Sequence, residues 1–566
     1  MILSEDYTHF SYDEKDLEAD DRVPYWFYAA GHTPPGMSHK PFYEWTWMNH
    51  CSRGFRYAAE KLSLPYTLGT DHRSYHGYEI VRVAVPDAEL KKRRSEGFRE
   101  SIKTFLDNYD VRWDNACQEL MGYYKELKNF DAEKATWFEL ELILEKLLEV
   151  DQRMWEIHMY FGCGLGAVYL LFEDICRELL QLEDTDTLFH NLMGGFDNKL
   201  NEVEKKLFLL SRRVKELALS DLFAAYKGTE VLSKLEESES GKQWLKEFNE
   251  FLWDDGWRTT YIFEYEPSWI EDPAPALGSI RQYLKCVNFV LDEMAPKIVN
   301  ERMEAEEEIL RRVSIDRRGW FKSLMVCAQK YNSWNESHEY YCELYCYAIT
   351  RHILLKIGQR LLRAGTIDKA DDVLFLVPEE LHKGLSDAST YRLQRTVHRR
   401  RRQWLENNKI VPPPMLGRVS IEEAGRLLFE GREPFITKVS IGDVVSPVPG
   451  SNADLFGLSA SPGIVEGPAR VIFSPDDIGE VKEGEILVTP STSAPWVSVF
   501  SLIKGVVTDR GGTLSHAAIQ GRQFGIPVVG NVVEGTSKIK TGQRIKVDGN
   551  LGLVYILKED EKWQQK

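Results

Sequence analysis

The stretch 508–530, TDRGGTLSHAAIQGRQFGIPVVG, places a single histidine between a pair of glycines and a short helix. An apolar segment with strand character comes just before it. Gly511 and Gly512 permit backbone conformations that a side chain would block. Ser515 is a typical N-cap residue, so His516 is expected in the first helical turn. We therefore expect this histidine to be held out at a helix N-terminus rather than packed into a core.

The helix is expected to cover residues 515–523 and to end at Gly525 and Pro527. Free N–H groups and the positive end of the helix dipole would surround His516 and suit a phosphoryl group on the imidazole. The same environment lowers the imidazole pKa, which keeps the ring neutral and nucleophilic. The long side chain of Arg522 could reach back toward a phosphate. For a histidine taken alone, simple capping or packing near a loop remains the alternative.

Composition limits the class of protein. The chain has 566 residues, which suits two to four domains, and it is 43% hydrophobic and 28% charged. The net charge of −17 argues against nucleic acids and anionic membranes as partners. We expect no signal peptide and no membrane span, because the acidic N-terminus lacks an apolar region and no apolar run approaches ~20 residues. The eight scattered cysteines predict free thiols in a cytoplasmic protein.

Three regions differ in their sequence pattern. Residues 1–410 predict a largely helical domain, with apolar residues at helical spacing over 135–161 and 336–365. Segment 411–457 contains VPPPMLG and a loop rich in Gly, Pro, Ser and Asp, which predicts a linker or hinge. Residues 458–566 alternate short strands and turns around one helix, which predicts a compact α/β domain. The expected fold is multidomain, a mostly α-helical domain followed by a C-terminal α/β domain.

The C-terminal region resembles the phosphohistidine swivelling domain of phosphoenolpyruvate-utilising enzymes. The resemblance implies that His516 is the phosphorylated residue. Two positions depart from the family pattern: Leu514, where Thr is usual, and Gly521, where Ala usually precedes the arginine. The segments that carry the resemblance are GGTLSHAAIQGRQFGIPVV, SASPGIVEGPARVIF, GEILVTPSTSAPWV and QRIKVDGNLGLVYIL.

The helical region resembles the substrate region of antibiotic and phenol phosphotransferases related to phosphoenolpyruvate synthase. No Gly-rich phosphate loop of an ATP-grasp fold is visible, and the chain ends at Lys566, so we expect neither an ATP-grasp unit nor a pyruvate barrel. This organisation is similar to the large subunit of aryl phosphate synthases, which act on phenol or p-cresol. That resemblance implies ATP and Mg²⁺ bound on a separate ATP-grasp subunit, and a small aromatic hydroxyl compound as acceptor. The segments are RGFRYAAEKLSLPY, WRTTYIFEYEPSWIEDPAPALGSIRQYL and DKADDVLFLVPEEL.

A phenol has a pKa near ~10, so a general base would help its attack on the phosphoryl group. Candidate ligands of the phosphate are Gly511, Gly512 and Ser515, which precede the histidine in the sequence. Arg258 is a further candidate, for the incoming phosphate. A purely structural role is the alternative for each candidate. The base candidates are His338, Glu264, Glu266, His158 and His32, and the aromatic wall candidates are Trp26, Phe27, Trp45, Trp47 and Tyr160.

Two other patterns have simpler explanations. His338, Cys342 and Cys346 share one helix face, but no fourth zinc ligand is evident, so we expect core packing and no metal site. The basic run 398–402 is expected to form a solvated helix face, with docking of a phosphate or an acidic partner as the alternative.

Three functions remain open from the sequence. The first is phosphorylation of an aromatic hydroxyl group. The second is phosphorylation of a non-aromatic alcohol or a natural product such as an antibiotic. The third is a phosphocarrier protein without its own small-molecule site. A closed aromatic cavity would favour the first function, an open groove the second, and a helical face without a pocket the third.

Overall fold

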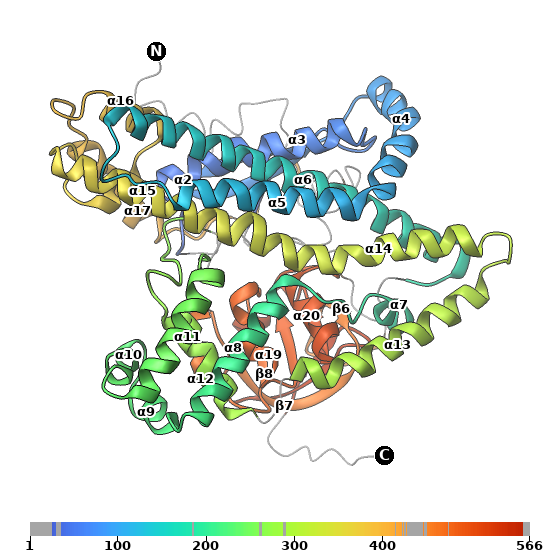
Figure 1. Cartoon of the computed structure of the whole chain (residues 1–566). Helices are drawn as coiled ribbons and strands as arrows, with labels where there is room; N and C mark the ends of the chain where they lie inside the picture. Colours follow the sequence, from blue (N-terminus) through green and yellow to red (C-terminus); the bar gives the residue numbers. More distant parts are fainter. Residues whose placement is uncertain are drawn as a thin grey trace. The chain divides into compact units, whose positions relative to one another are not determined.

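The chain divides into two compact units in the computed structural model (Figure 1). Unit 1 contains residues 1–164, 262–267 and 341–433, and unit 2 contains residues 165–261, 268–340 and 434–566. Each unit therefore combines segments that are far apart in the sequence. The structure describes residues 25–29, 36–183, 186–259, 263–286, 290–413, 415–420, 423, 426, 445, 450–473 and 475–557.

Unit 1 combines a small antiparallel sheet with helices. Its four strands have the order β2-β3-β1-β4, and the last strand comes from more than 300 residues beyond the others. The strands are β1 (Tyr25–Tyr28), β2 (Gly69–Tyr75), β3 (Tyr78–Ala84) and β4 (Met415–Gly417). The helices are α2 (Pro41–Thr46), α3 (Ser52–Lys61), α4 (Ala88–Asp107), α5 (Tyr109–Lys128), α15 (Tyr345–Arg363), α16 (Pro378–Ser386) and α17 (Gln394–Asn407), with a π-helical turn at Trp47–Cys51 and a 3-10 helix at Ala370–Phe375.

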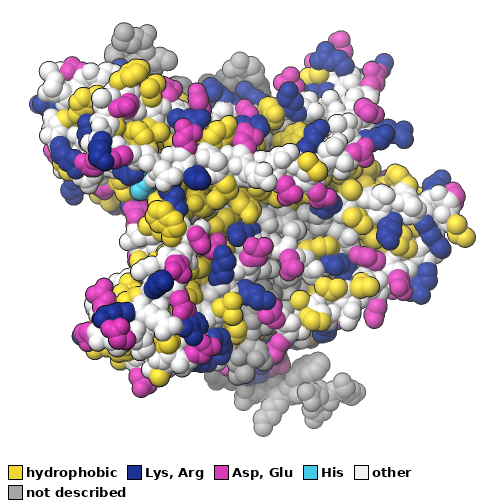
Figure 2. Space-filling view, in the orientation of Figure 1, with side chains coloured by type: hydrophobic (Ala, Val, Ile, Leu, Met, Phe, Trp, Pro, Cys, Tyr) yellow, Lys and Arg dark blue, Asp and Glu magenta, His cyan; other side chains and the backbone are white. Residues whose placement is uncertain are grey.

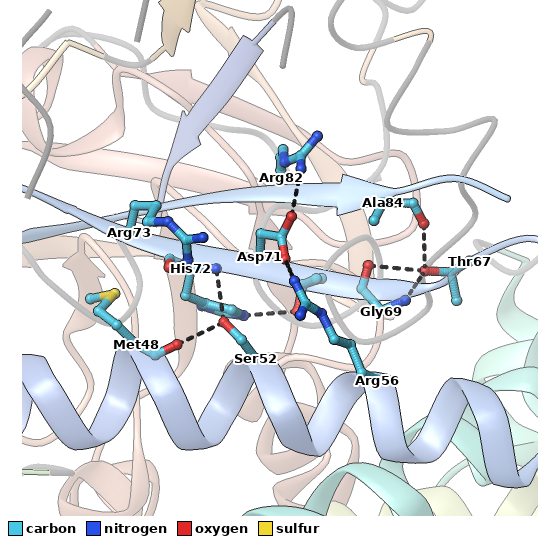
Figure 3. Close-up of polar contacts among 11 residues, drawn as sticks. Met48, Ser52, Arg56, Thr67, Gly69, Asp71, His72, Arg73, Arg82 and Ala84 are labelled. Carbon is cyan, nitrogen blue, oxygen red and sulfur yellow. Dashed lines mark hydrogen bonds and ion pairs between the residues drawn. The ribbon is translucent and has the colours of Figure 1, made fainter. Parts of the chain in front are cut away.

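Polar contacts fix strand β2 against the helix beside it (Figure 3). The Ser52 hydroxyl accepts a hydrogen bond from the backbone N–H of His72 at 3.0 Å. The buried carboxylate of Asp71 pairs with Arg82 at 2.7 Å and also with Arg56 from helix α3. Because the carboxylate has two cationic partners, its burial between strand and helix is compensated.

Helix α6 (Trp137–Leu180) is the longest helix, with 44 residues. By length and composition alone it could cross a membrane, since an 18-residue window has a mean hydropathy of 1.3. However, 78% of that window is buried inside the protein. Such burial is typical of a core helix, which its apolar composition suits equally well.

The helical pattern predicted over 336–365 belongs to three consecutive elements. They are the end of α14 (Arg318–His338), a π-helical segment (Glu339–Leu344) and α15. The final turn ends as predicted, because Gly365 has a φ of +72°. π-Helical turns are rare and frequently occur at functional sites, which draws attention to Glu339.

Unit 2 places an eight-stranded sheet together with helices of the central sequence. The strand order is β5-β12-β11-β7-β8-β9-β10-β6, and β7 to β10 run parallel. Its core consists of apolar strand residues such as Ile486, Val507 and Ile545. The strands are β5 (Leu455–Phe456), β6 (Leu458–Ser461), β7 (Ile464–Val471), β8 (Ile486–Thr489), β9 (Gly505–Thr508), β10 (Val528–Gly530), β11 (Arg544–Asp548) and β12 (Leu553–Ile556).

The helices of unit 2 come from the central and the C-terminal parts of the sequence. Helix α20 packs against α13 and α14, which a short turn connects in Figure 1. The helices are α7 (Thr187–Leu192), α8 (Lys199–Glu216), α9 (Ser220–Ala225), α10 (Glu230–Leu235), α11 (Glu239–Asp255), α12 (Ala274–Lys285), α13 (Val290–Arg312), α19 (Val497–Phe500), α20 (His516–Phe524) and α21 (Gly535–Lys538), with 3-10 turns at Pro475–Glu480 and Ala494–Trp496.

The predicted fold class, a mostly helical region followed by a C-terminal sheet domain, is confirmed. The boundaries 1–410, 411–457 and 458–566 stay a prediction, and most of the expected hinge lies outside the described residues. Within unit 2, the sheet segment forms one compact body with helices of segments 165–261 and 268–340. Long-range packing of this kind is not visible in local sequence patterns.

The basic run 398–402 in α17 is more than a solvated helix face. Arg400 is 3% exposed and forms a buried ion pair with Glu380. Arg401 pairs with Asp372 at 2.7 Å. Glu380 and Asp372 thus neutralise the charges of two arginines of this run within unit 1.

Candidate active site

Helix α20 begins and ends as the sequence predicts. Ser515 has extended backbone angles, and its hydroxyl accepts a hydrogen bond from the N–H of Ala518 at 3.5 Å. Gly525 ends the helix in the left-handed conformation, with a φ of +66°. Of the glycine pair, Gly511 needs this conformational freedom, with a φ of +111°, whereas Gly512 does not.

The ring of His516 is held from two sides in unit 2. The hydroxyl oxygen of Thr492 lies 2.9 Å from Nδ1, and Oε2 of Glu336 lies 3.5 Å from Nε2. The side chain is only 6% exposed, and the ring of Phe500 lies edge-on at 6.1 Å. The expectation that this ring is held out at the surface is therefore wrong, because α14 packs over the start of α20.

Burial sets the charge of His516. It lowers the pKa of the imidazole to about 3, so the ring is neutral at pH 7. A neutral imidazole has one N–H and one lone pair. If Nδ1–H donates to the oxygen of Thr492, the lone pair lies on Nε2, the nitrogen that faces Glu336. Nucleophilic attack is then possible from Nε2.

Glu336 is a buried carboxyl group that the sequence reasoning missed. The side-chain amide of Gln520 donates to its Oε2 at 2.6 Å, and that of Asn335 donates to its Oε1 at 3.3 Å. Burial raises its pKa to about 8, and the nearby Glu339 adds to the shift. Glu336 can therefore gain or lose a proton close to neutral pH.

A second carboxyl group, Glu339, is linked to the histidine through a loop. Its Oε1 accepts a hydrogen bond from the backbone N–H of Ala494 at 3.2 Å. Ala494 lies two residues after Thr492, which contacts His516. Burial raises the pKa of Glu339 to about 6. Glu336, near the end of α14, and Glu339, at the start of the π-helical segment that follows, thus bring two titratable groups to the phosphohistidine candidate.

Arg522 braces the loop that precedes α20. Its Nη1 donates to the carbonyl oxygens of Thr513 and Ala460, each at 2.9 Å. Its Nη2 donates to Oδ1 of Asn332 at 3.3 Å. The predicted contact with a phosphate stays a prediction, since these bonds describe a residue that positions the loop.

Glu264 lies in unit 1 among aromatic rings. It is completely buried, and burial raises its pKa to about 8. Neither carboxylate oxygen has a hydrogen-bond partner in the described part of the chain. Tyr43 lies at the centre of the cluster, with its ring 5.1 Å from Phe263 and 5.4 Å from Tyr347.

The candidate histidines are packed against tryptophans. His338 stacks on Trp334 at 4.2 Å, and burial lowers its pKa to about 3. His158, in unit 1, stacks on Trp155 at 5.1 Å, and its Nδ1 lies 3.6 Å from the carboxylate of Glu343. Each histidine therefore has a structural explanation of its own. Glu266 is partly exposed, and His32 lies outside the described residues.

Three of the predicted aromatic wall residues of unit 1, Trp26, Trp45 and Tyr160, lie in different surroundings. Trp26 is 3% exposed in strand β1 and packs on Ile80 and Leu416. Trp45 is half-buried and edge-on to a histidine. Tyr160 lines a surface pocket of about 570 Å³, where its hydroxyl accepts a bond from Arg112 at 2.7 Å. Only Tyr160 of these three residues lies at that pocket.

The sequence contained signals for the missed residues. Glu336 and Glu339 flank His338 in NESHEYY, the stretch from which we selected only the histidine. Gln520 lies four residues after His516, so both side chains share one face of α20. Thr492 could not be linked to the histidine without the tertiary structure.

The surface in Figure 2 mixes charges of both signs. Lysine and arginine side chains are interspersed with aspartate and glutamate, and no broad basic area is visible on the face shown. Histidine occupies only a small area of this face.

Comparison with known protein families identifies two parts of the chain. Residues 481–552 match the mobile domain of PEP-utilising enzymes, and this range contains His516. Residues 156–336 match the fourth domain of rifampicin phosphotransferase, and this range contains Arg258 and Glu336. The chain thus combines a PEP-utilising mobile domain with a rifampicin phosphotransferase-like domain. The predicted relation to phenylphosphate synthase in particular is not shown.

Individual relatives agree with this assignment. An uncharacterised phosphotransferase YvkC of Bacillus subtilis is 30% identical over 387 residues, 67% of this chain and 44% of the relative. A rifampicin phosphotransferase of Bacillus cereus is 27% identical over 295 residues, 51% of this chain and 32% of the relative. A probable phosphoenolpyruvate synthase of Pyrococcus horikoshii is 42% identical over 135 residues, 24% of this chain and 16% of the relative. The chain spans less than half the length of these curated relatives.

Proposed function

We propose that this protein is a phosphotransferase that carries a phosphoryl group on His516 and delivers it to the hydroxyl group of a small aromatic compound. One observation carries the proposal. A neutral imidazole lies in the first turn of α20, with Nδ1 beside the Thr492 hydroxyl and Nε2 facing Glu336. The match of residues 481–552 to a PEP-utilising mobile domain supports it.

In the first half-reaction, the lone pair of Nε2 attacks a phosphorus atom of the donor. A P–N bond forms, and the P–O bond to the leaving nucleotide breaks. This step uses the tautomer with the proton on Nδ1, 2.9 Å from the oxygen of Thr492, and that proton remains on the ring. Backbone N–H groups at the start of α20 and the helix dipole favour the negative phosphoryl group.

In the second half-reaction, the hydroxyl oxygen of the acceptor attacks phosphorus. The P–N bond breaks, and its electron pair returns to Nε2, which restores the neutral imidazole. The hydroxyl proton needs a base, and Glu336 beside Nε2 has a suitable pKa of about 8. In both transfers, positioning of the reacting groups and neutralisation of charge contribute most of the rate acceleration.

Glu264 is a second candidate for the base. Its unpaired, buried carboxyl group lies among Tyr43, Phe263 and Tyr347 in unit 1. These rings support an aromatic acceptor over an aliphatic one, because aromatic pairs add about 0.5–1.5 kcal/mol beyond area burial. Variants of Glu336 and Glu264 distinguish the two candidates.

We propose ATP as the donor, bound with Mg²⁺ on a separate ATP-grasp subunit. The resemblance of the chain to aryl phosphate synthases supports this part. Carboxylate oxygens are ligands that Mg²⁺ prefers. However, Glu336 and Glu339 already accept hydrogen bonds from Gln520 and Ala494, so their surroundings do not form a prepared magnesium site. No step above depends on a metal held by this chain.

A natural-product acceptor is the alternative that the comparisons favour. The domain match and three relatives bear the name rifampicin phosphotransferase. Such an acceptor would undergo the same chemistry at His516, but it would need a larger site. A phosphocarrier role without a small-molecule site is a third possibility, and it predicts phosphorylated His516 without any small phosphorylated product.

The test combines this chain with a neighbouring-gene ATP-grasp protein, labelled ATP, and panels of phenols, aliphatic alcohols and rifamycins. We expect label first on His516 and then on a phenol. Label on a rifamycin but on no phenol would replace the aromatic acceptor with a natural product. A His516→Ala variant that still forms the product would overturn the phosphohistidine mechanism.

A further inference from the structure

Arg258 is a buried arginine of unit 2 whose guanidinium group has no hydrogen-bond partner in the described part of the chain. It lies three residues after the end of α11 and is 1% exposed. Its carbonyl oxygen accepts a hydrogen bond from the N–H of Trp269, and its guanidinium group lies 4.3 Å above the ring of the same residue. Backbone and ring together hold the side chain in one place.

The guanidinium donors of Arg258 are unused. None of its three side-chain nitrogens has a hydrogen-bond partner among the described residues. A buried charge without hydrogen bonds is strongly unfavourable, so such a group normally has a partner. This position therefore indicates a ligand that accepts several hydrogen bonds at once.

Two carboxyl groups that interact electrostatically with Arg258 already have other partners. Glu204 accepts a hydrogen bond from the hydroxyl of Tyr283 at 2.8 Å. Asp255 accepts bonds from Lys206 at 2.5 Å and from the hydroxyl of Tyr340 at 3.2 Å. They attract Arg258 electrostatically but do not fill its donor positions. The local charge therefore stabilises an arginine there while leaving the N–H donors at the edge of its guanidinium group for another group.

The position of Arg258 is connected to the site of His516. Glu339 interacts electrostatically with both Arg258 and Glu336. The same carboxylate accepts the N–H of Ala494, in the loop whose Thr492 contacts the histidine. Arg258 is thus connected to the candidate nucleophile indirectly, through Glu339 and the loop that carries Thr492.

We propose that Arg258 is a binding residue for a phosphoryl group, either the one attached to His516 or a free phosphate. Binding of the phosphoryl group attached to His516 rests on the proposed function, whereas binding of free phosphate does not. A guanidinium group offers parallel N–H donors that match two phosphoryl oxygens. Its charge offsets the negative charge of the phosphoryl group next to Glu336 and Glu339, which would otherwise repel it.

The first experiment measures thermal unfolding of the full chain with inorganic phosphate. We expect phosphate to raise the Tm of the wild type and not that of Arg258→Met. Arg281→Met is the matched control, because Arg281 also lies over an aromatic ring of unit 2 but donates to the carbonyls of Tyr226 and Gly228. Its phosphate response should equal that of the wild type. An equal phosphate-induced shift in Arg258→Met would overturn a site for free phosphate.

Stability without phosphate separates a binding role from a structural one. Arg258→Met should keep or raise the Tm, because it removes an unsatisfied buried charge and methionine packs well on an aromatic ring. Arg281→Met should lower it. A clear loss of Tm in Arg258→Met would show that the arginine serves packing and would contradict the proposal.

Phosphoryl transfer tests the group attached to the histidine. Arg258→Met should slow labelling of His516 or its discharge about 100-fold or more, and Arg258→Lys should restore part of the rate. A wild-type rate in both variants would overturn binding of the attached phosphoryl group. If the wild type is never labelled, the proposed function fails, whereas the phosphate-dependent Tm still decides whether Arg258 binds free phosphate.

Discussion

Nε2 of His516 lies 3.5 Å from Oε2 of Glu336, yet the two groups do not form an ion pair at neutral pH. Burial lowers the pKa of the imidazole to about 3 and raises that of the carboxyl group to about 8. Both are therefore uncharged at pH 7, which makes their shared burial tolerable. A phosphoryl group on Nε2 would change this balance, because it brings negative charge next to a carboxyl group that can ionise.

Replacement of the two candidate bases should affect the second half-reaction differently. Glu336→Gln should lower the rate of transfer from phosphorylated His516 to the acceptor about 100-fold. The transfer rate of the wild type should rise with pH up to about 8 and that of the variant should not, because ionised Glu336 accepts the proton. Single-turnover transfer at several pH values is the measurement. Glu264→Gln is the comparison, and an effect confined to that variant would assign the base to Glu264.

The buried carboxyl group of Glu336 should make stability depend on pH. In the folded state it keeps its proton up to about pH 8, whereas in the unfolded chain it ionises near its usual value of 4.5. The unfolded state therefore binds fewer protons, and stability falls as the pH rises between these two values. Glu336→Gln should show a smaller fall of Tm between pH 5 and pH 8. The exposed Glu483→Gln variant should follow the wild type, and an unchanged slope in Glu336→Gln would contradict the shifted pKa.

The hydroxyl group of Thr492 should control the reactive form of the imidazole. Thr492→Val removes the oxygen that lies 2.9 Å from Nδ1 of His516. We expect the variant to label the histidine about tenfold more slowly, which is the effect of losing one hydrogen bond. Without this bond, the orientation and the tautomer of the ring are less well fixed. Thr508→Val is the control, since the buried hydroxyl of Thr508 has no hydrogen-bond partner among the described residues. Equal labelling rates in both variants would argue against this role.

Steric crowding explains why position 521 has glycine, where the family pattern usually has alanine. A Cβ atom at this position would lie 2.3 Å from Cγ2 of Val528 and 3.0 Å from Cβ of Ser461. Gly521→Ala should therefore lower stability by about 1–3 kcal/mol despite the better helix propensity of alanine. Urea unfolding measures the change. The double variant Gly521→Ala/Val528→Ala removes the clash, so it should lose less stability than the two single changes added together.

Local patterns predicted the elements around the nucleophile. The glycine pair, the N-cap Ser515 and the C-terminal Gly525 defined helix α20 to within one residue. Several apolar segments of 458–566 became strands of one sheet, among them GEILVTP (β8) and QRIKVDG (β11). These signals act over a few residues, through backbone conformation, capping and alternation, so they can be recognised without knowledge of the fold.

The sequence by itself determined that His516 lies at the start of a capped helix in a domain of the phosphohistidine type. Tertiary structure alone decided that the ring is buried and that Glu336, 180 residues earlier, faces its Nε2. The same holds for Arg258, whose unused donors became visible only when its surroundings were known. The reason is physical. Caps and strands arise from neighbouring residues, whereas burial, pKa shifts and unpaired donors depend on groups that only long-range packing brings together.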